Sequence, residues 1–453
     1  MSSKDKQISM EELTSFAKRR GFVFQASELY GGIAGFWDFG PYGVELANNI
    51  KRSWWREFVH KNPEVVGLDS TIIQNPRLWK ASGHIDTFVD PMIDCKACKH
   101  RFRADHVAGV DTNDLKKLDQ ALEGKACPNC GKTKTFTPAR TFGMMFKTYV
   151  GPIEDAANMS YLRPETAGGI FTDFEQVRET VRAKLPFGIA QIGKAFRNEI
   201  TPGDFIFRVR EFEQMELEYF VDPKDAKKWY EHWKKACMAW CESIGLSNTN
   251  LQFHDHGDDE RAHYADASVD IQYKYPFGFK ELYGIANRTD FDLKAHAKES
   301  GRDLSYFDEA SGKRFVPYVI EPSVGVSRLM LALLLDAYDE EEVGDEKRVV
   351  LRFKSEVAPV KVAILPLSKK PELSKLARVV YAEVAGEYNV EYDETQSIGR
   401  RYRRQDEIGT PYCVTVDFES LEDESVTVRE RDSMKQVRIK IDKLKNYLEA
   451  KLS

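Results

Sequence analysis

The sequence predicts an α+β protein: a large domain on an antiparallel sheet, a small cysteine-containing insertion within it, and a separate α/β domain toward the C-terminal end. Three observations carry this prediction. Residues 195–220 have the pattern of a polar and aromatic hairpin, two CxxC pairs lie within residues 90–140, and strand and helix patterns alternate from residue 360 onward. At 453 residues the chain is too long for one ordinary core, which favours two or three domains.

The composition is typical of a globular protein, with 42% hydrophobic and 30% charged residues. A net charge of −6 argues against broad, sequence-independent binding to nucleic acid, although a local basic face remains compatible with it. The first ten residues are polar and lack the apolar core of a secretory signal. The longest apolar run, Leu329 to Leu335, is far shorter than the ~20 residues that span a bilayer. We expect a cytosolic protein without a membrane span.

Polar alternation is the main feature of residues 195–220. Pro202 and Gly203 predict a turn, and the run after it alternates with the period of a strand. Arginine forks suit phosphates, and an aromatic ring beside them can stack on a base, so the hairpin predicts a nucleotide site. One face of the predicted strand carries Arg208, Arg210, Phe212, Gln214 and Glu216, and the other carries Val209, Met215 and Leu217.

The remaining elements follow from periodicity and from turn residues. In the first half we expect helices over 10–20, 44–59 and 169–184, a Gly/aromatic loop or hairpin over 27–43, and a strand over 65–76 that ends on Pro76 at a sheet edge. In the second half we expect a helix over 221–250, strands and loops over 273–292, a strand running into an apolar helix over 316–335, a linker over 339–347, strands at 360–365, 390–392, 412–416 and 425–429, and a helix at 375–387. Arg328 stands at the start of the apolar helix, where a phosphate or a base is a suitable partner.

Two CxxC pairs predict a metal site. Cys95 with Cys98, and Cys127 with Cys130, provide four thiolates, which is the ligand set of a structural zinc without an open coordination position. The alternatives are a redox pair and a site that no longer holds metal. The other three cysteines, at positions 237, 241 and 413, have no such spacing and are expected to be ordinary thiols.

Several segments together resemble glycyl-tRNA synthetases of the dimeric, single-polypeptide class II type, and the resemblance covers nearly the whole chain. The first and second class II motifs resemble VVGLDSTIIQNPRLWKASGH (65–84) and Phe196-Arg197-Asn198-Glu199 followed by Arg208-x-x-x-Phe212. The third resembles residues 321–328, and GFWDFGPYG (35–43) and LRPETA (162–167) add to the match.

This resemblance implies an organisation and an activity. A class II catalytic domain would span residues 1–345, with a zinc-ribbon-like insertion at 90–140 and a partly helical insertion at 221–270, and an anticodon-binding domain would span 346–453. The chain would form a homodimer. It would activate glycine with ATP and Mg²⁺ to glycyl-adenylate and pyrophosphate, and then transfer the glycyl group to the 3′ end of tRNA(Gly).

The resemblance also implies site residues. Arg197 would bind the α-phosphate, adenine would lie between Phe212 and Arg328, and Glu281 would help to hold Mg²⁺; Arg197, Glu281 and Arg328 are the expected catalytic residues. The ATP site would comprise Arg197, Asn198, Glu199, Phe207, Arg208, Val209, Arg210, Glu211, Phe212, Glu281, Leu282, Gly325, Val326, Ser327 and Arg328. The glycine site would comprise Arg103, Glu165, Phe212, Glu213, Gln214, Met215, Glu216, Arg288, Glu321, Pro322, Ser323, Val324 and Gly325.

The chemistry suits these residue types. Both steps develop charge on phosphate or carbonyl oxygens, so fixed arginines and Mg²⁺ are the catalysts required, and no side-chain nucleophile is needed. Glycine offers no side chain to bind. Carboxylates around its ammonium group supply charge-assisted hydrogen bonds, and crowding at its Cα excludes alanine.

Some residues have competing structural interpretations. One of Arg208 and Arg210 could form only a cross-strand ion pair with the neighbouring glutamates. His254, His256 and His263 have no metal-binding spacing, and we favour surface or structural roles. Residues 400–404 contain four arginines (Arg400, Arg401, Arg403 and Arg404) that form either a solvated basic face or a contact with tRNA phosphates. Gly168 replaces a glutamine that is common in the family, which we expect to tune affinity.

Three other functions compete with this hypothesis. Another class IIa synthetase, for seryl, threonyl, prolyl or histidyl transfer, is disfavoured by Glu165, Glu216 and the triplet Glu321-Pro322-Ser323. A binding protein on the same scaffold, like the accessory subunit of mitochondrial DNA polymerase, is disfavoured because the ATP arginines are present. A zinc-ribbon nucleic-acid protein is disfavoured because the insertion is a small part of the chain.

Overall fold

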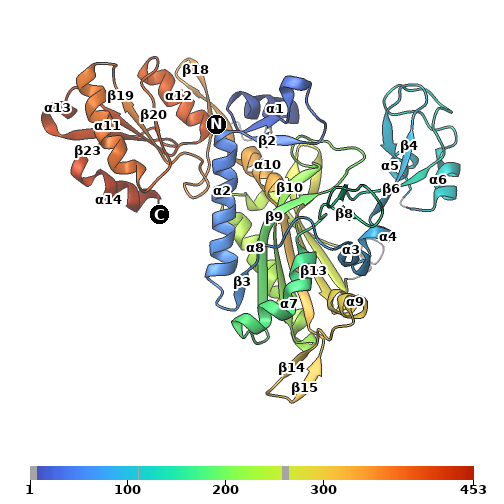
Figure 1. Ribbon diagram of the computed structural model, residues 1–453. Coiled ribbons are helices and arrows are strands. Elements are labelled where there is room, and N and C mark those ends of the chain that lie inside the picture. Colours follow the sequence, from blue (N-terminus) through green and yellow to red (C-terminus); the bar gives the residue numbers. More distant parts are fainter. Residues whose placement is uncertain (1–7, 111, 258–264, 453) are drawn as a thin grey trace.

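A seven-stranded sheet forms the centre of the molecule in this computed structural model, which describes residues 8–110, 112–257 and 265–452 (Figure 1). The strand order is β11 (Leu251–Asp255), β12 (Ala267–Tyr275), β13 (Gly278–Thr289), β16 (Tyr318–Gly325), β10 (Glu211–Val221), β9 (Phe187–Phe196) and β3 (Val65–Gly67). All neighbours are antiparallel except β3 and β9, which are parallel. The predicted antiparallel sheet is therefore confirmed.

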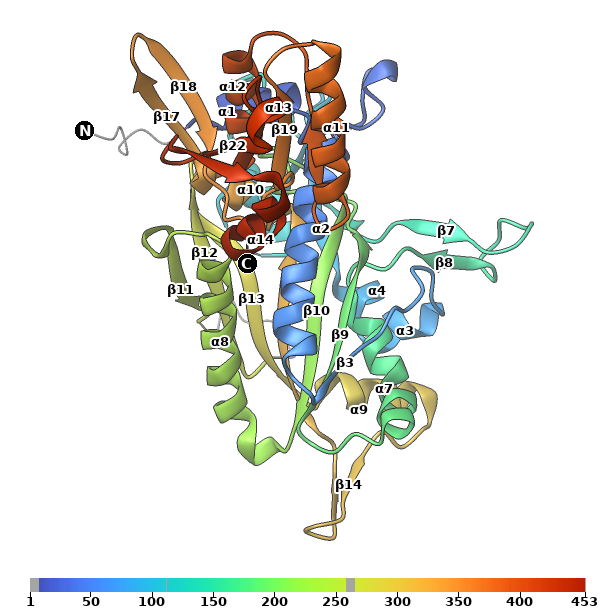
Figure 2. The same cartoon turned by 90° about the vertical axis from the view of Figure 1, so that its left-hand side faces the viewer.

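Helices cover both faces of this sheet (Figures 1 and 2). One face packs against α2 (Pro41–Trp55), α8 (Ala226–Ser243) and α10 (Val326–Ala337) in the main hydrophobic core, and the other packs against α7 (Ala167–Val181) and α9 (Phe291–Ser300). Because side chains alternate along a strand, Met215, Leu217 and Tyr219 of β10 enter the main core, and Glu216 and Glu218 face the side of α7 and α9.

The N-terminal elements follow the prediction closely. Helix α1 (Met10–Arg19) begins at a capping box, in which the Ser9 side chain accepts from the Glu12 N–H and Glu12 reaches back to Ser9. Strands β1 (Val23–Gln25) and β2 (Trp37–Phe39) pair around the Gly/aromatic loop, which contains the short η1 (Glu28–Tyr30). Helix α2 runs into a π-helical turn, η2 (Arg56–His60).

The strand predicted over 65–76 is much shorter. It covers only β3, which does lie at a sheet edge, and Pro76 instead begins helix α3 (Pro76–Ala81). The Asn75 side chain caps this helix by accepting from the Arg77 N–H, and a proline at the first helical position has no N–H to satisfy. The short α4 (His84–Thr87) follows.

The cysteine-containing insertion has its own sheet and core and stands apart on the right of Figure 1. Its sheet has the order β5 (Arg101–Arg103), β4 (Val89–Asp94) and β6 (Arg140–Gly143), and α5 (Ala104–Ala108) and α6 (Leu115–Leu122) pack on it. A further hairpin, β7 (Lys147–Tyr149) and β8 (Met159–Tyr161), leads back to the main sheet and projects to the right in Figure 2.

Two predicted segments have a different structure. In the segment predicted as a partly helical insertion, of which residues 221–257 and 265–270 are described, α8 buries Trp233, Cys237 and Trp240 in the main core. The short η3 (Pro223–Asp225) precedes α8, and η4 (Asn248–Asn250) leads into β11. The predicted linker over 339–347 is a hairpin of β17 (Tyr338–Val343) and β18 (Glu346–Leu351). Its acidic residues pair with basic residues, Glu340 with Lys347 and both Asp339 and Glu341 with Arg352, which a charge count does not reveal. A third hairpin, β14 (Tyr306–Asp308) and β15 (Lys313–Phe315), lies beyond α9.

The C-terminal part is a separate α/β unit with its own core. Its five-stranded sheet has the order β20 (Val390–Tyr392), β19 (Val362–Pro366), β21 (Tyr412–Val416), β22 (Ser425–Glu430) and β23 (Gln436–Lys440). The helices are α11 (Pro371–Ala385), α12 (Ile398–Ile408), α13 (Ser420–Asp423) and α14 (Ile441–Leu452). Helix α12 was not predicted, because it is rich in arginine and its buried face is mainly polar, with Arg401, Gln405 and Asp406 beside Ile408.

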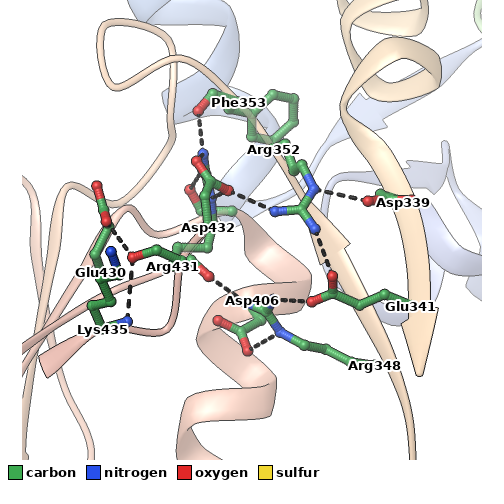
Figure 3. Close-up of polar contacts among 12 residues, drawn as sticks. Asp339, Glu341, Arg348, Arg352, Phe353, Asp406, Glu430, Arg431, Asp432 and Lys435 are labelled. Carbon is green, nitrogen blue, oxygen red and sulfur yellow. Dashed lines mark hydrogen bonds and ion pairs between the residues drawn. The ribbon is translucent and has the colours of Figure 1, made fainter. Parts of the chain in front are cut away.

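Buried ion pairs join this unit to the β17–β18 hairpin, as Figure 3 shows in part. Asp406 on α12 accepts from Arg348 Nε at 2.8 Å and from Arg429 Nη1 at 2.9 Å, and Arg348 and Asp406 are fully buried. Arg352 bonds to Asp339 and Glu341 on the hairpin and to Asp432 beyond β22. The hairpin is thus a structural junction between the two cores. Among the described helices, none is long and apolar enough to cross a membrane.

Candidate functional site

The loop between β9 and β10 is longer than the predicted turn. It covers residues 197–210, so Arg208 and Arg210 precede β10 and do not share a strand face with Phe212. The Arg210 guanidinium donates to the backbone carbonyls of Glu199 and Ala34, at 2.7 Å and 2.8 Å, and Arg208 lies 3.8 Å from the Glu199 carboxylate. Arg210 thus ties the loop to the Gly/aromatic segment, and the predicted alternation holds only from Phe212 onward.

Four glutamates meet beside the centre of the sheet. Glu216 and Glu218 come from β10, Glu321 comes from β16, and Glu165 comes from the loop before α7. One carboxylate oxygen from each of Glu216, Glu218 and Glu321 lies within 4.8 Å of the others. We call these four residues the carboxylate group. Three of its members, Glu165, Glu216 and Glu321, are residues that the resemblance implies for the glycine site.

Neighbouring residues fix Glu216 and Glu321 by hydrogen bonds. The Thr166 N–H donates to Glu216 at 3.1 Å, and the Thr166 hydroxyl donates to the same oxygen. Arg288 donates to Asp292 at 2.7 and 2.8 Å and to Glu321 at 2.5 Å. The site is therefore built before any ligand enters it.

Two supporting residues escaped prediction from the sequence. His84 Nε2 lies 3.4 Å from Glu165, and Asp292 orients Arg288. His84 ends the segment that resembles the first class II motif, which was a usable signal for it. Asp292 stands four residues after Arg288, a spacing that is too common in sequences to be informative.

Burial and neighbouring charges separate the pKa values of the carboxylate group. Burial raises the pKa of Glu321 to about 8, with Arg288 opposing this rise and Glu216 adding to it. Burial raises the pKa of Glu218 well above its ordinary value, and it also raises the pKa of Glu216. Burial acts on Glu165 in the same direction, but His84, Arg288 and Arg197 outweigh it and bring the pKa down to about 2. The group thus contains both ionised and protonated carboxyls.

Arg197 lies between this group and the exposed part of the site. Its Nε donates to the Pro164 carbonyl at 3.1 Å, and its guanidinium carbon lies 5.5 Å from the Phe212 ring centroid. Within the described ranges, no carboxylate lies within ion-pair distance of Arg197. A positive charge fixed next to an aromatic ring is a suitable place for a phosphate beside a base.

Two other residues predicted for the nucleotide, Arg328 and Glu281, pair with each other. Arg328 Nη1 is 2.9 Å from the Glu281 carboxylate, and the Arg328 guanidinium carbon is 4.5 Å from the Phe207 ring centroid. Arg328 therefore stacks on Phe207, whereas Phe212 lies next to Arg197. The structure brings Arg328 and Glu281 into direct contact, and the sequence predicted no such pair.

Three other predicted site residues form ion pairs with residues outside the carboxylate group. Arg103 is bound by Asp90 and Asp105, at 2.8 and 2.6 Å, in the insertion. Among the described residues, the ion pairs and side-chain hydrogen bonds of Arg103 are to Asp90 and Asp105 and not to the carboxylate group. Glu213 pairs with Lys51, and Glu211 pairs with Lys194.

The remaining predicted residues lie along the loop and the central strands. Gln214 Nε2 donates to Ser323 Oγ at 3.2 Å, so both line the same face as Glu216. Asn198 and Glu199 lie in the loop, and Pro322 and Gly325 lie on β16, with Ser327 following in α10. Five of the predicted residues have buried apolar side chains, so only their backbone could reach a ligand: Val209, Met215, Leu282, Val324 and Val326.

The four cysteines of the CxxC pairs converge. Cys95 Sγ is 3.8 Å from Cys130 Sγ, and Cys98 Sγ is 3.7 Å from Cys127 Sγ. These separations are much longer than a disulfide bond of about 2.05 Å. A tetrahedral zinc with Zn–S distances of about 2.3 Å places its sulfurs about 3.8 Å apart, so the donor set fits zinc. Cys237, Cys241 and Cys413 are buried free thiols.

The other singled-out residues have structural roles in the described ranges. His256 pairs with Asp270 at 2.9 Å, and the described part of the chain shows no metal cluster of histidines; His263 lies outside it. Arg401 is buried and donates to the carbonyls of Pro366, Asp393 and Leu367, so it is not part of a solvated basic face.

The glycine at position 168 has a packing role. A Cβ at Gly168 would lie 2.8 Å from Leu78 and 3.0 Å from the Trp79 ring, so α3 packs against α7 in the space that a side chain would need. A glutamine here would require both side chains to move.

Comparisons with known proteins agree over the whole chain. Residues 152–338 match the family described as the tRNA synthetase class II core domain (G, H, P, S and T), and residues 361–451 match the anticodon binding domain family. The chain is 54% identical over 460 residues to the glycine–tRNA ligase of Caldanaerobacter subterraneus subsp. tengcongensis, covering 98% of this chain and 99% of the relative. It is 54% identical to that of Clostridium acetobutylicum, with the same coverage, and 55% identical to that of Acetivibrio thermocellus, covering 98% of both chains.

Proposed function

The chain belongs to the family of class II glycine–tRNA ligases, and from this premise we propose that it activates glycine with ATP and transfers it to the 3′ end of tRNA(Gly). One observation carries the proposal into the site: a preformed group of buried carboxylates lies beside an arginine that has no acidic partner in the described ranges. The first matches an ammonium group and the second a phosphate. Together they match the two reactants of an adenylation step.

The first step joins glycine to the nucleotide. A glycine carboxylate oxygen attacks the α-phosphorus, a P–O bond forms, and pyrophosphate leaves. Arg197 would hold the α-phosphate, and Glu165, Glu216 and Glu321 would hold the ammonium. Since the carboxylates and the arginine are positioned beforehand, the two reactants are oriented without reorganisation of the site.

The nucleotide would lie along β10 and the start of α10. Phe212, which lies next to Arg197, would stack on one face of the adenine. Arg328 would lie on the other face of the adenine. ATP is the substrate used by class II synthetases. Mg²⁺ held by Glu281 would neutralise charge on the phosphates. In the second step, the terminal hydroxyl of tRNA attacks the glycyl carbonyl, and AMP leaves.

Selection of glycine would depend on charge and on exclusion. Glu216 and Ser323 lie opposite each other on β10 and β16, where they would crowd the Cα of a bound amino acid. Rejection by a steric clash can exceed the ~1–3 kcal/mol that one methyl group contributes to favourable binding. Alanine would be excluded on this basis.

We extend the proposal to zinc in the insertion. The sulfur–sulfur distances and the all-cysteine donor set support a structural ion held by Cys95, Cys98, Cys127 and Cys130. Measurement of metal content on the purified protein tests this: one zinc per chain supports it, and a Cys98→Ser, Cys127→Ser variant should lose the ion.

The proposal also assigns a function to each domain of the chain. Residues 1–345 would form the catalytic domain, and residues 346–453 would bind the anticodon. We also propose a cytosolic homodimer. The projecting β7–β8 hairpin has three exposed apolar side chains, Tyr149, Val150 and Ile153, which supports a contact of this hairpin with another protein chain. Sedimentation equilibrium tests the dimer.

A charging assay tests the function directly. The purified protein, ATP, Mg²⁺ and unfractionated tRNA should charge tRNA with glycine and not with serine, threonine, proline or histidine. Charging with one of these and not with glycine would identify a different class IIa synthetase. Binding of tRNA without charging by any of them would identify a binding protein on this scaffold.

A further inference from the structure

The carboxylate group contains one member that no part of the proposed reaction uses. Glu218 lies on β10, two residues beyond Glu216, and is fully buried. Neither of its carboxylate oxygens has a hydrogen-bond partner within the described residues. A buried polar group without a partner costs stability, so its position at a ligand site is informative.

Strand register places Glu218 against a second carboxylate. Glu216 pairs with Ser323 and Tyr219 with Ile320, so Glu218 stands opposite Glu321 on the neighbouring strand. Oxygens of Glu216, Glu218 and Glu321 lie within 4.8 Å of one another. Two ionised carboxylates directly opposite each other repel, and burial strengthens this repulsion.

The charges around Glu218 are mostly negative. Glu216 on β10, Glu321 on β16 and Asp292 on α9 face it, and Arg288 on β13 is the cation that acts on it. Arg288 is already shared by Asp292 and Glu321. One guanidinium cannot neutralise this set, so the balance must come from protons and from the ammonium of the substrate.

We propose, resting on the function proposed above, that Glu218 is a positioning residue for the substrate ammonium. It stays protonated and donates a hydrogen bond to the Glu321 carboxylate when glycine is bound. Glu321 and Glu216 then present fixed, ionised oxygens to the ammonium, and no like-charged pair remains behind them. Burial of Glu218, which favours the neutral acid, supports this assignment.

Two substitutions separate this role from simple filling of the core. Glu218→Gln keeps the volume and an N–H donor, whereas Glu218→Leu keeps much of the volume and removes the donor. Glycine-dependent pyrophosphate exchange should show the KM for glycine raised about tenfold or more in Glu218→Leu, with kcat and the KM for ATP changed far less. In Glu218→Gln, the KM for glycine should return to within about threefold of that of the unmodified protein.

A matched control lies one residue further along the strand. Tyr219 points into the opposite core, where its hydroxyl contacts Glu64 at 3.3 Å, so Tyr219→Phe should leave the KM for glycine unchanged. Infrared spectra supply a second measurement, since Glu218→Gln should remove the C=O band of a protonated carboxyl group.

The outcomes decide the proposal. An unchanged KM for glycine in Glu218→Leu, or an equal rise in Glu218→Gln and Glu218→Leu, would overturn it. If Glu218→Leu does not fold, the infrared measurement decides: a spectrum of Glu218→Gln that keeps every carboxyl C=O band of the unmodified protein would by itself overturn the proposal. Failure of the proposed function looks different, because the unmodified protein would then show no glycine-dependent exchange.

Discussion

At the scale of residues, the site depends on side chains that other side chains hold in place. Arg288 is fixed by Asp292, Glu216 by Thr166, and Glu165 by contact with His84. Thr166 and His84 lie far from their partners in the sequence, whereas Asp292 stands four residues after Arg288. A pattern within one segment can identify Glu216, but it cannot show which distant residue will meet it.

Arg197→Ala should abolish glycyl-adenylate formation without unfolding the protein. The substitution removes the charge expected at the α-phosphate, and stabilisation of charge there is the main source of catalysis in such reactions. The measurement is pyrophosphate exchange, accompanied by circular dichroism. Arg302→Ala, which removes an exposed arginine paired with Glu175, is the matched control and should keep full activity. Substantial exchange by Arg197→Ala would refute the assignment.

Glycine affinity should rise with pH up to about pH 8. The pKa of Glu321 in the free protein is about 8, above its ordinary value of 4.5, so below pH 8 the ammonium must displace a proton to bind an ionised Glu321. One released proton increases affinity by up to about tenfold per pH unit. The KM for glycine measured between pH 6 and pH 8 checks this, and Glu321→Gln should flatten the slope.

The Glu321 carboxyl also affects the stability of the folded protein. Because its pKa is higher in the folded than in the unfolded chain, the folded protein binds more protons between pH 4.5 and about 8. Its contribution to the free energy of unfolding therefore falls as the pH rises through that interval. Added glycine should oppose this fall. A pH-independent KM for glycine would contradict this account.

At the scale of elements, long periodic segments were predictable and short polar ones were not. The helices α2, α7 and α10 and the strands β19 and β21 follow their apolar spacing. The strand expected over 65–76 failed because Pro76 starts a helix, and α12 was missed because four arginines dominate its composition. Structure in these places depends on tertiary contacts, such as those of buried Arg401 with three carbonyls.

The stability of the insertion should depend on the proposed zinc, and the stability of the central sheet should not. The insertion has a small core of its own, so loss of four sulfur–metal bonds removes much of its stability, whereas the central sheet has a separate and larger core. After treatment with a zinc chelator, hydrogen exchange should rise across residues 90–140 and remain slow in β9 and β10. Equal loss of protection in both regions would count against a local structural site.

At the scale of the whole molecule, buried ion pairs connect the two large cores. Asp406 binds Arg348 from the hairpin and Arg429 from β22, and all three side chains are buried. The charge run at 339–347 was expected to be a linker, but its acidic residues pair with arginines that lie beyond it in the sequence. The junction is therefore ordered for reasons that a composition count does not contain.

Asp406→Ala should destabilise this junction strongly. Removing the carboxylate leaves buried Arg429 without its carboxylate partner and Arg348 with only Glu341 and the Arg431 carbonyl, and breaking a buried ion pair in this way costs about 3–5 kcal/mol. Thermal unfolding of the full chain should show an earlier transition for the C-terminal unit, and tRNA charging should fall more than pyrophosphate exchange. Lys445→Ala breaks an exposed pair with Glu387 and should leave the transition unchanged. An unaltered transition in Asp406→Ala would contradict the proposed junction.

The central claim is that the carboxylate group and Arg197 together form an adenylation site for glycine. ATP–pyrophosphate exchange on the purified full chain, with glycine, alanine and serine supplied one at a time, tests it most directly. The structure predicts rapid exchange with glycine and little with the other two, because the ammonium site is shared but the space beside Cα is not. Exchange with alanine or serine as fast as with glycine, or no exchange with glycine, would contradict the claim.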